Sequence, residues 1–391
     1  MNPESEKRWQ ANVFVIYLLG FLFTLHGALP AYINSTFLSR FISEKFVGLL
    51  YTVSAILTIF IFAKIPQILR RFGNYKTIMA LLAVDFLALL GLAFTANRAI
   101  ISVCFVLTFI SISLIGFNLD IFLERFSKDS VTGKIRGTLL STSNIAWIIA
   151  PLIGSFILTD GDYWKIFLAT ATLILPIMFL LRNNLQNFSD PEYKITPLKN
   201  TTNEILRDKN TRSVFFVSFL LQFFYSWEII YMPIYLYTYL GFSWQQIGVM
   251  FSIMLLPFVL TEAPLGKLAD TRWGEKEVMS VGFIVMALST AMVPFIVAKN
   301  MLLWTALLFV SRVGASMVEI MSETYFFKKI DSARANIIGL FRTMRPLAYL
   351  VSPVIAIALF TVGLQIKYIF IALAVIMFLG LHFSLELKDT R

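Results

Sequence analysis

Long apolar runs alternate with short polar segments along the whole chain. A helix needs about 20 apolar residues to cross the hydrocarbon core of a bilayer, which is roughly 30 Å thick. We therefore predict an all-α membrane protein that crosses the lipid bilayer with twelve transmembrane helices, at 12–32, 46–63, 77–95, 100–121, 137–158, 163–181, 213–238, 247–265, 278–297, 301–323, 337–359 and 367–385.

The longest polar stretch, 182–212, separates these runs into two sets of six. It is rich in Asn, Ser, Asp, Pro and Lys, a composition typical of linkers. We predict five segments: a cytoplasmic N-terminus (1–11), an N-terminal six-helix bundle (12–181), this cytoplasmic linker (182–212), a C-terminal six-helix bundle (213–385) and a cytoplasmic C-terminus (386–391).

The two halves resemble each other at a constant offset of about 200 residues. The matching positions are Pro30 and Pro233, Ser43 and Ser243, Asp120 and Glu319, Gly137 and Gly339, and Pro151 and Pro353. Parallel repeats of six helices are a transporter architecture in which the substrate site lies between the halves near the middle of the membrane. The repeat therefore predicts two pseudo-symmetric bundles and a transport function.

Composition and charge support this interpretation. Hydrophobic residues make up 58% of the chain and charged residues 14%, and the formal net charge is +10. With the N-terminus inside, 24 of the 33 Lys and Arg residues fall in cytoplasmic segments, as the positive-inside rule requires. The basicity is thus a topology signal, and we expect no nucleic-acid partner.

The sequence lacks the residue patterns needed for several kinds of chemistry. A single cysteine, Cys104, permits no intramolecular disulfide, and the chain has only two histidines. No phosphate-binding loop and no metal-ligand spacing occur in the sequence. We therefore expect neither an enzyme, nor a metal site, nor a cofactor, with a proton gradient as the energy source.

One loop carries a family resemblance. The segment from Gly266 through Asp270, Arg272 and Gly274 to Lys276 reads Gly-Lys-Leu-Ala-Asp-Thr-Arg-Trp-Gly-Glu-Lys. It resembles the cytoplasmic loop motif of the major facilitator superfamily. The resemblance implies a monomeric secondary transporter of the twelve-helix fold, in which this loop takes part in gating.

The gating hypothesis extends to charges at neighbouring helix ends. Arg272 can pair with Glu323, and Asp120 and Glu124 can pair with Arg71 or Arg125. In the first-half copy of the motif, Ile65 and Leu69 replace the glycine and the aspartate, while Arg71 and Gly73 remain. We therefore expect asymmetric gating. Small residues and a proline in the fifth span (Asn144, Ala150, Pro151, Gly154) also resemble the fifth-helix motif of the superfamily's proton antiporters.

Ionisable side chains inside predicted spans are candidates for function, because charge at bilayer depth is costly. They are His26, Asp85, Glu228, Arg312, Glu319, Arg342 and Arg345. A carboxylate in a low-dielectric cavity can load and release a proton near neutral pH. The alternative is structural: Glu228–Arg312 and Glu319–Arg345 can be static ion pairs, His26 can hydrogen-bond within the bundle, and Asp85 lies on a helix expected at the periphery.

The resemblance places the first, fourth, seventh and tenth helices around the central cavity. It thereby assigns His26, Asn118, Asp120, Glu228, Arg312 and Glu319 to the translocation path. Carboxylates in the seventh and tenth helices also resemble the proton-coupling pair of multidrug efflux pumps. Trp227 and Tyr231 next to Glu228 suit an amphipathic cation, although rings in a span more commonly face lipid or other helices.

We therefore expect an alternating-access transporter in a cell membrane, specifically the cytoplasmic membrane of a prokaryote. It would export small organic or amphipathic compounds in exchange for protons. Two alternatives remain open. One is an importer or uniporter of an anionic solute that is bound by Arg312, Arg342 and Arg345. The other is a transporter-like receptor or lipid-handling protein.

Overall fold

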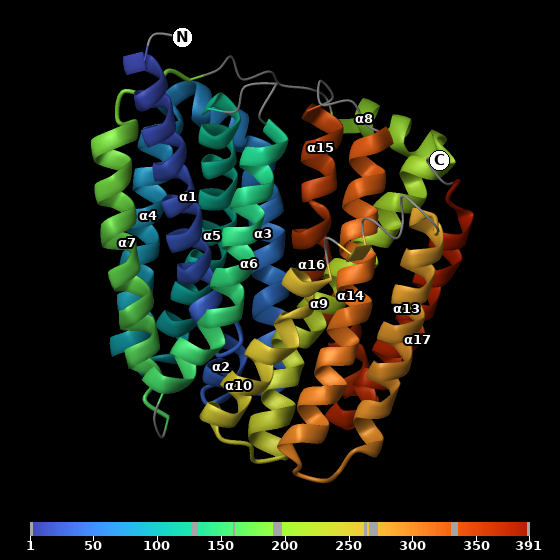
Figure 1. Ribbon diagram of the computed structural model, residues 1–391. Coiled ribbons are helices and arrows are strands. Elements are labelled where there is room, and N and C mark those ends of the chain that lie inside the picture. Colours follow the sequence, from blue (N-terminus) through green and yellow to red (C-terminus); the bar gives the residue numbers. More distant parts are fainter. Residues whose placement is uncertain are drawn as a thin grey trace. The chain divides into compact units, whose positions relative to one another are not determined.

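The computed structural model describes residues 3–126, 132–158, 161–190, 198–261, 264–265, 273–329 and 335–388, with side chains beginning at Phe14 (Figure 1). Regular structure in these residues is entirely helical. Within these ranges, ten helices are long and apolar enough to cross a membrane. Two shorter apolar helices, Thr142–Ile157 and Trp244–Leu260, coincide with the predicted fifth and eighth spans.

The described residues of the first half form α1 (Pro3–Ala31), α2 (Asn34–Ser39), α3 (Glu44–Phe72), α4 (Asn74–Phe94), α5 (Arg98–Phe126), α6 (Thr132–Ile157) and α7 (Tyr163–Leu185). The second half contains α8 (Leu198–Arg207), α9 (Lys209–Ile234), the π-helix η1 (Tyr235–Tyr239), α10 (Trp244–Leu255), α11 (Pro257–Leu260), α13 (Glu275–Met292), η2 (Val293–Phe295), α14 (Met301–Lys329), α15 (Ala335–Arg342), α16 (Met344–Thr361), η3 (Ile366–Tyr368) and α17 (Ile369–Glu386).

Two details differ from the sequence-based expectation. The stretch predicted as a linker contains the ten-residue helix α8, and α9 already begins at Lys209. The predicted eighth span is interrupted after α10, where Pro257 starts the short helix α11. Proline lacks a backbone N–H and cannot continue the hydrogen-bond ladder of the preceding helix.

The chain divides into two compact units. Unit 1 comprises residues 1–42 and 53–194, and unit 2 comprises residues 43–52 and 195–391. The helix α3 therefore begins in unit 2 and continues in unit 1.

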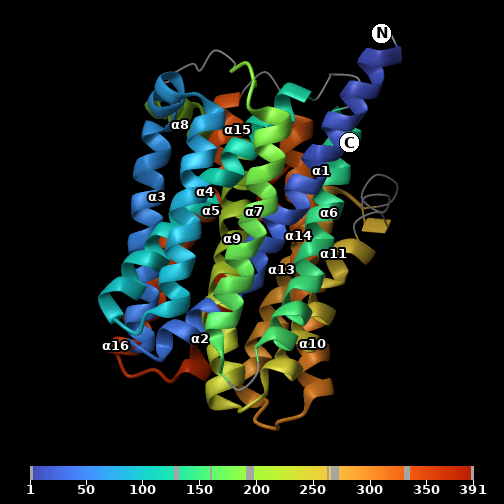
Figure 2. The same cartoon turned by 90° about the vertical axis from the view of Figure 1, so that its left-hand side faces the viewer.

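Unit 1 is held together by long helices that pack side by side (Figure 2). α1 packs on α6 and α7, and α4 packs on α5 and α7. Ile65 and Leu69 of α3 are buried against Ile110 and Leu114 of α5. The two residues that replace the glycine and aspartate of the loop motif therefore serve as apolar packing positions in this unit.

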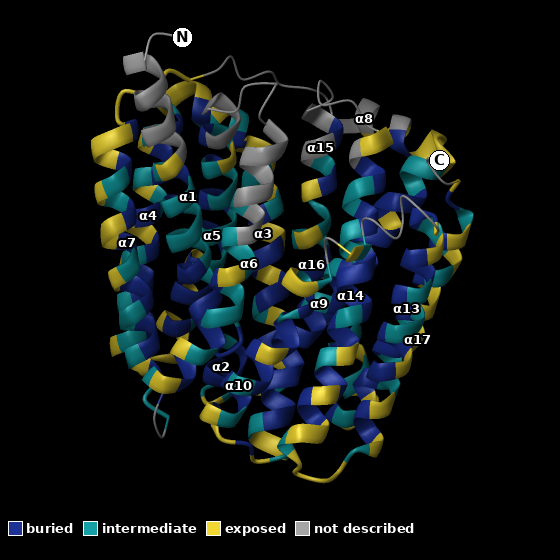
Figure 3. Cartoon of the chain, viewed as in Figure 1, coloured by how far each residue is buried: buried dark blue, intermediate teal, exposed yellow. Residues whose placement is uncertain are grey.

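Unit 2 is organised around α9, α13 and α14. α13 packs along α14 and α17, while α9 packs on α14, α16 and α17. In the most apolar window of Lys209–Tyr239, 78% of the residues are buried, against 39% in each unit 1 span. Figure 3 shows many buried residues along α9 and α14, interrupted by intermediate and exposed ones. Side chains on α9 are therefore enclosed by other helices of the unit.

Candidate functional site

The buried interior of unit 2 contains an acid–base pair. Glu228 on α9 and Arg312 on α14 approach each other with 3.8 Å between Oε2 and Nη2, and their side chains are 3% and 2% exposed. A charge removed from water this completely is stable only with a partner. The pair that the sequence suggested is therefore present, and it is enclosed by protein.

Aromatic rings hold the guanidinium of Arg312 in place. Its Cζ lies 5.1 Å from the ring centre of Phe224 and 5.4 Å from that of Tyr225. Both distances lie within the range at which a cation is attracted to an aromatic face. Arg312 is thus bound by two consecutive residues of α9 in addition to Glu228.

Tyr225 connects this pair to the second carboxylate. Its hydroxyl donates a hydrogen bond of 2.7 Å to Oε2 of Glu319, which is half-buried on α14. Contacts therefore run from Glu228 to Arg312, from Arg312 to the Tyr225 ring and from its hydroxyl to Glu319. The sequence interpretation gave Tyr225 no role of its own. A signal was available, because Tyr225 and Glu228 are three residues apart and lie on one helix face.

The pair retains unused hydrogen-bonding capacity. Among the described residues, Nε and Nη2 of Arg312, Oε2 of Glu228 and Nε1 of Trp227 have no hydrogen-bond partner. A buried polar atom without a partner costs roughly 1–3 kcal/mol. Such atoms cluster where a protein keeps polar groups for purposes other than stability.

Trp227 and Tyr231 pack inside the unit and do not face lipid. Their ring centres are 5.7 Å apart, and the Phe223 ring lies 5.3 Å from that of Trp227 in a tilted arrangement. Tyr231 further contacts Phe360 of α16 at 5.8 Å. Both side chains are fully buried, so they are part of the aromatic interior of unit 2.

The other arginines have partners. Arg342 donates a hydrogen bond of 2.8 Å to Glu323, the residue expected to pair with Arg272. Arg345 is exposed and hydrogen-bonds the Tyr349 hydroxyl.

Four predicted gating groups lie outside the described part of the chain: Gly266, Asp270, Arg272 and the side chain of Glu124. Two predicted gating groups of the first half, Arg71 and Asp120, are exposed. The Cζ atom of Arg71 lies 5.2 Å from the ring centre of Phe72.

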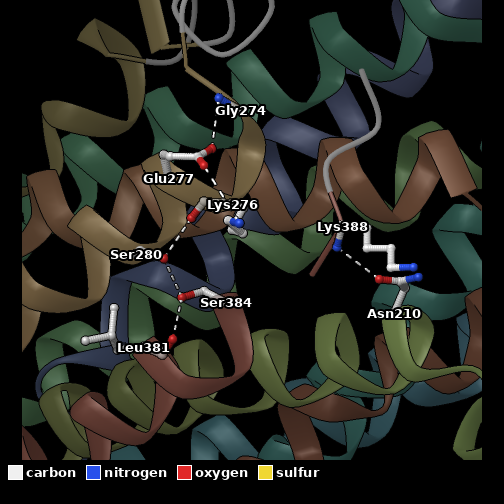
Figure 4. Close-up of polar contacts among 8 residues, drawn as sticks. All are labelled: Asn210, Gly274, Lys276, Glu277, Ser280, Leu381, Ser384 and Lys388. Carbon is white, nitrogen blue, oxygen red and sulfur yellow. Dashed lines mark hydrogen bonds and ion pairs between the residues drawn. The ribbon is translucent and has the colours of Figure 1, made fainter. Parts of the chain in front are cut away.

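Gly274, the last glycine of the loop motif, lies directly before α13. Its N–H donates to the Glu277 carboxylate at 3.0 Å (Figure 4). One turn further, the hydroxyls of Ser280 and Ser384 lie 2.8 Å apart and join α13 to α17. The N–H of Lys388 donates to Asn210 at the start of α9 at 3.0 Å. These contacts tie α9, α13 and α17 together near the loop motif.

In unit 1, His26 lies between three helices. Its Nε2 is 2.8 Å from Oδ2 of Asp85 on α4, and its Nδ1 is 3.0 Å from the carbonyl oxygen of Thr170 on α7. All three residues are fully buried. The structure thus joins His26 to Asp85, which the sequence interpretation kept apart.

Asn118 belongs to a second buried polar group of unit 1. The side-chain amide of Asn118 donates to the Leu114 carbonyl at 2.7 Å. The side-chain amide of Asn74 donates to the backbone carbonyl of Asn118 at 3.0 Å. The Asn74 N–H in turn donates to Asp190 at 2.8 Å. Asp190, which follows α7, therefore caps the N-terminus of α4, where a carboxylate is favoured.

Apolar helices of spanning length, arranged in two units with buried charges, define a multi-pass helical membrane protein. Residues 214–390 match the sequence profile of the Major Facilitator Superfamily. Over 180 residues the chain is 29% identical to the "Tetracycline resistance protein, class H" of Pasteurella multocida, a match that spans 44% of this chain and 42% of that relative's length.

Solved structures agree in fold across the whole chain. A bacterial homolog to the human lysosomal transporter Spinster, in an inward-facing and occupied conformation, has a TM-score of 0.76 at 10% identity and covers 95% of both chains. A mutant of the nucleoside transporter NupG has a TM-score of 0.74 at 14% identity, covering 96% of this chain and all of the other. Residues 214–390 are thus similar to the Major Facilitator Superfamily, and the likeness to these solved transporters shows that the chain has their fold.

Proposed function

We propose that the protein is a secondary active transporter that works by alternating access and exports small organic or amphipathic compounds in exchange for protons. Glu228 and Glu319 carry the proton, and Arg312 adjusts their charge. The observation that carries this proposal is the buried contact between Glu228 and Arg312 at 3.8 Å, continued through Tyr225 to Glu319.

The chemistry follows from burial. Low polarity around Glu228 favours a neutral carboxyl, while Arg312 favours the ionised form. Protonation of Glu228 removes the attraction to Arg312, and a cationic substrate competes with both the proton and Arg312 for the carboxylate. Binding of protons and binding of substrate are then mutually exclusive, which is the requirement for antiport.

Two observations support export over the import of an anionic solute. The three arginines that would bind an anion are each engaged, by Glu228, Glu323 and Tyr349. The name of the Pasteurella multocida relative associates that protein with tetracycline resistance, and removal of a drug from the cell is a route to resistance.

Transport in proteoliposomes with an imposed pH gradient tests the proposal. The probes are tetracycline and ethidium, an amphipathic cation. We expect the gradient to drive accumulation of a probe by the natural protein. Glu228→Gln and Glu319→Gln should each abolish the gradient dependence, because an amide cannot carry the proton. The control is Glu277→Gln, since the Glu277 carboxylate accepts a bond that the amide oxygen of Gln can also accept.

If both variants transport at the natural rate with the same pH dependence, the assignment of Glu228 and Glu319 is wrong. Uptake of an anionic solute that is lost in Arg312→Gln would support the importer. Binding of a probe without exchange across the vesicle membrane would support the receptor or lipid-handling alternative.

A further inference from the structure

The hydrogen bonds of His26 determine where its protons lie. The carbonyl oxygen of Thr170, 3.0 Å from Nδ1, can only accept, so Nδ1 carries a hydrogen. The contact of 2.8 Å between Nε2 and Oδ2 of Asp85 then requires one further proton between these two atoms. The His26–Asp85 dyad therefore holds one shared proton and has no net charge.

Loss of the shared proton would change the packing of the helices. Neutral His26 would then present the Nε2 lone pair to an ionised carboxylate only 2.8 Å away. Two acceptors at this distance repel each other, so the contact between α1 and α4 would open. The proton occupancy of the dyad is in this way linked to the positions of these helices.

Stability alone gives no reason for the dyad. Replacing a buried ion pair by apolar residues of similar size is often neutral or stabilising. Oδ1 of Asp85 is also buried and has no hydrogen-bond partner among the described residues, which costs free energy. This oxygen is the unfilled acceptor of the dyad.

Other titratable groups on the surrounding helices lie away from the dyad along the chain. Lys76, nine residues before Asp85, is about 13 Å away along α4. On α7, Lys165 pairs with Asp162. The remaining described groups on α1, α4, α5 and α7 are Tyr17, Tyr75, Arg98, Cys104, Asp120, Tyr163 and Arg182, and the described side chains of α6 include no titratable one.

We propose that the His26–Asp85 dyad is a proton-binding site of unit 1, separate from the carboxylates of unit 2. Its loaded state is the neutral dyad with the proton shared between Nε2 and Oδ2. Release of that proton leaves neutral His26, protonated at Nδ1, and ionised Asp85. The site needs no substrate to titrate, so it can be tested independently of the antiport proposal.

Nitrogen NMR of the full-length protein labelled with 15N-histidine tests this site directly. The chain has only two histidines, so in His382→Gln the only histidine signals are those of His26. We expect Nδ1 to stay protonated throughout. Nε2 should shift from its protonated to its unprotonated position as the pH is raised. An Nε2 signal that does not move with pH overturns the proposal.

Asp85→Asn in the His382→Gln background is the matched variant. The asparagine amide can donate to neutral Nε2 and keep the hydrogen bond, but it cannot titrate. We expect the Nε2 shift with pH to be lost while the Nδ1 signal is kept. The same titration in Asp85→Asn as in the parent would also overturn the assignment. Because the first measurement leaves the dyad intact, the test does not depend on the folding of this variant.

Failure here is distinguishable from failure of the proposed function. Glu228→Gln and Glu319→Gln change unit 2 only, so the His26 titration should persist in both. Transport that remains coupled to the pH gradient without any titration of His26 would overturn this site and leave the antiport proposal standing.

Discussion

Gly282 of α13 and Gly314 of α14 face each other where the two helices cross. A Cβ on either residue would lie 2.7 Å from the carbonyl oxygen of the other. Contact this close between backbones requires residues without side chains, a common feature of packed membrane helices. The crossing fixes the position of α14 along α13, and Arg312 lies only two residues before Gly314.

Gly314→Ala should therefore destabilise unit 2. The added methyl group meets backbone atoms of α13, which cannot move aside alone, and overpacking of this kind costs about 1–3 kcal/mol. Thermal unfolding in detergent should show a lower midpoint. Gly27→Ala is the control, since its nearest neighbour is a side-chain atom of Ile112 at 3.7 Å, an ordinary contact. Equal midpoints for both variants would contradict the crossing described here.

Arg312→Gln tests the buried pair through stability. The substitution leaves the Glu228 carboxylate without its counter-charge, which costs up to about 3–5 kcal/mol when the remaining charge stays ionised. Adding Glu228→Gln removes that charge. We expect the double variant to be more stable than Arg312→Gln alone, with a coupling energy of about 0.5–3 kcal/mol. Unfolding of the natural protein, both single variants and the double variant measures this coupling, and strictly additive effects would contradict the pair.

Tyr225→Phe separates the two contacts of that side chain. The phenylalanine ring keeps the aromatic face over Arg312, but the hydroxyl that donates to Glu319 is lost. We expect a folded protein whose transport depends on pH differently from that of the natural protein, because a hydrogen bond to a carboxylate favours its ionised form. Tyr237→Phe is the control, as the ring of Tyr237 stacks on Trp244. An unchanged pH profile in Tyr225→Phe would separate Glu319 from the coupling site.

The apolar pattern predicted most helices of the fold, because each helix that crosses the membrane needs about 20 predominantly apolar residues. The same pattern cannot reveal breaks such as that between α10 and α11, where the single residue Pro257 interrupts the helix. It also could not reveal that Ile65 and Leu69, seen as departures from a loop motif, are packing positions against α5.

The polar contacts were predictable only where the candidates are charged groups in the middle of predicted spans. Glu228 and Arg312 stood out because charge in the middle of a span is costly. The partnership of His26 with Asp85 joins residues 59 apart, and that of Asn74 with Asp190 joins residues 116 apart. Such pairs depend on which helices become neighbours, and a single sequence contains no local signal for this.

Asp208 caps the N-terminus of α9, the helix that carries Tyr225 and Glu228. Its carboxylate accepts a hydrogen bond of 2.7 Å from the Thr211 N–H. Hydrogen bonding with Thr211, assisted by the positive charge of Lys329, holds the pKa of Asp208 below its usual value. We expect Asp208→Ala to lower the free energy of unfolding by about 1 kcal/mol, the typical contribution of such a cap.

The lowered pKa of Asp208 also gives the sign of the pH dependence. Its contribution is fully present above the pKa of the unfolded chain, about 3.9, and is lost as the pH falls through the lower pKa of the folded state. The stability difference between the natural protein and Asp208→Ala should therefore be constant near neutral pH and shrink below about pH 4. Asp208→Asn keeps an oxygen acceptor that does not titrate, so its difference from Asp208→Ala should not change with pH. Unfolding measured across this range checks both expectations, and a difference that grows in acid would show that Asp208 does not cap α9 as a carboxylate.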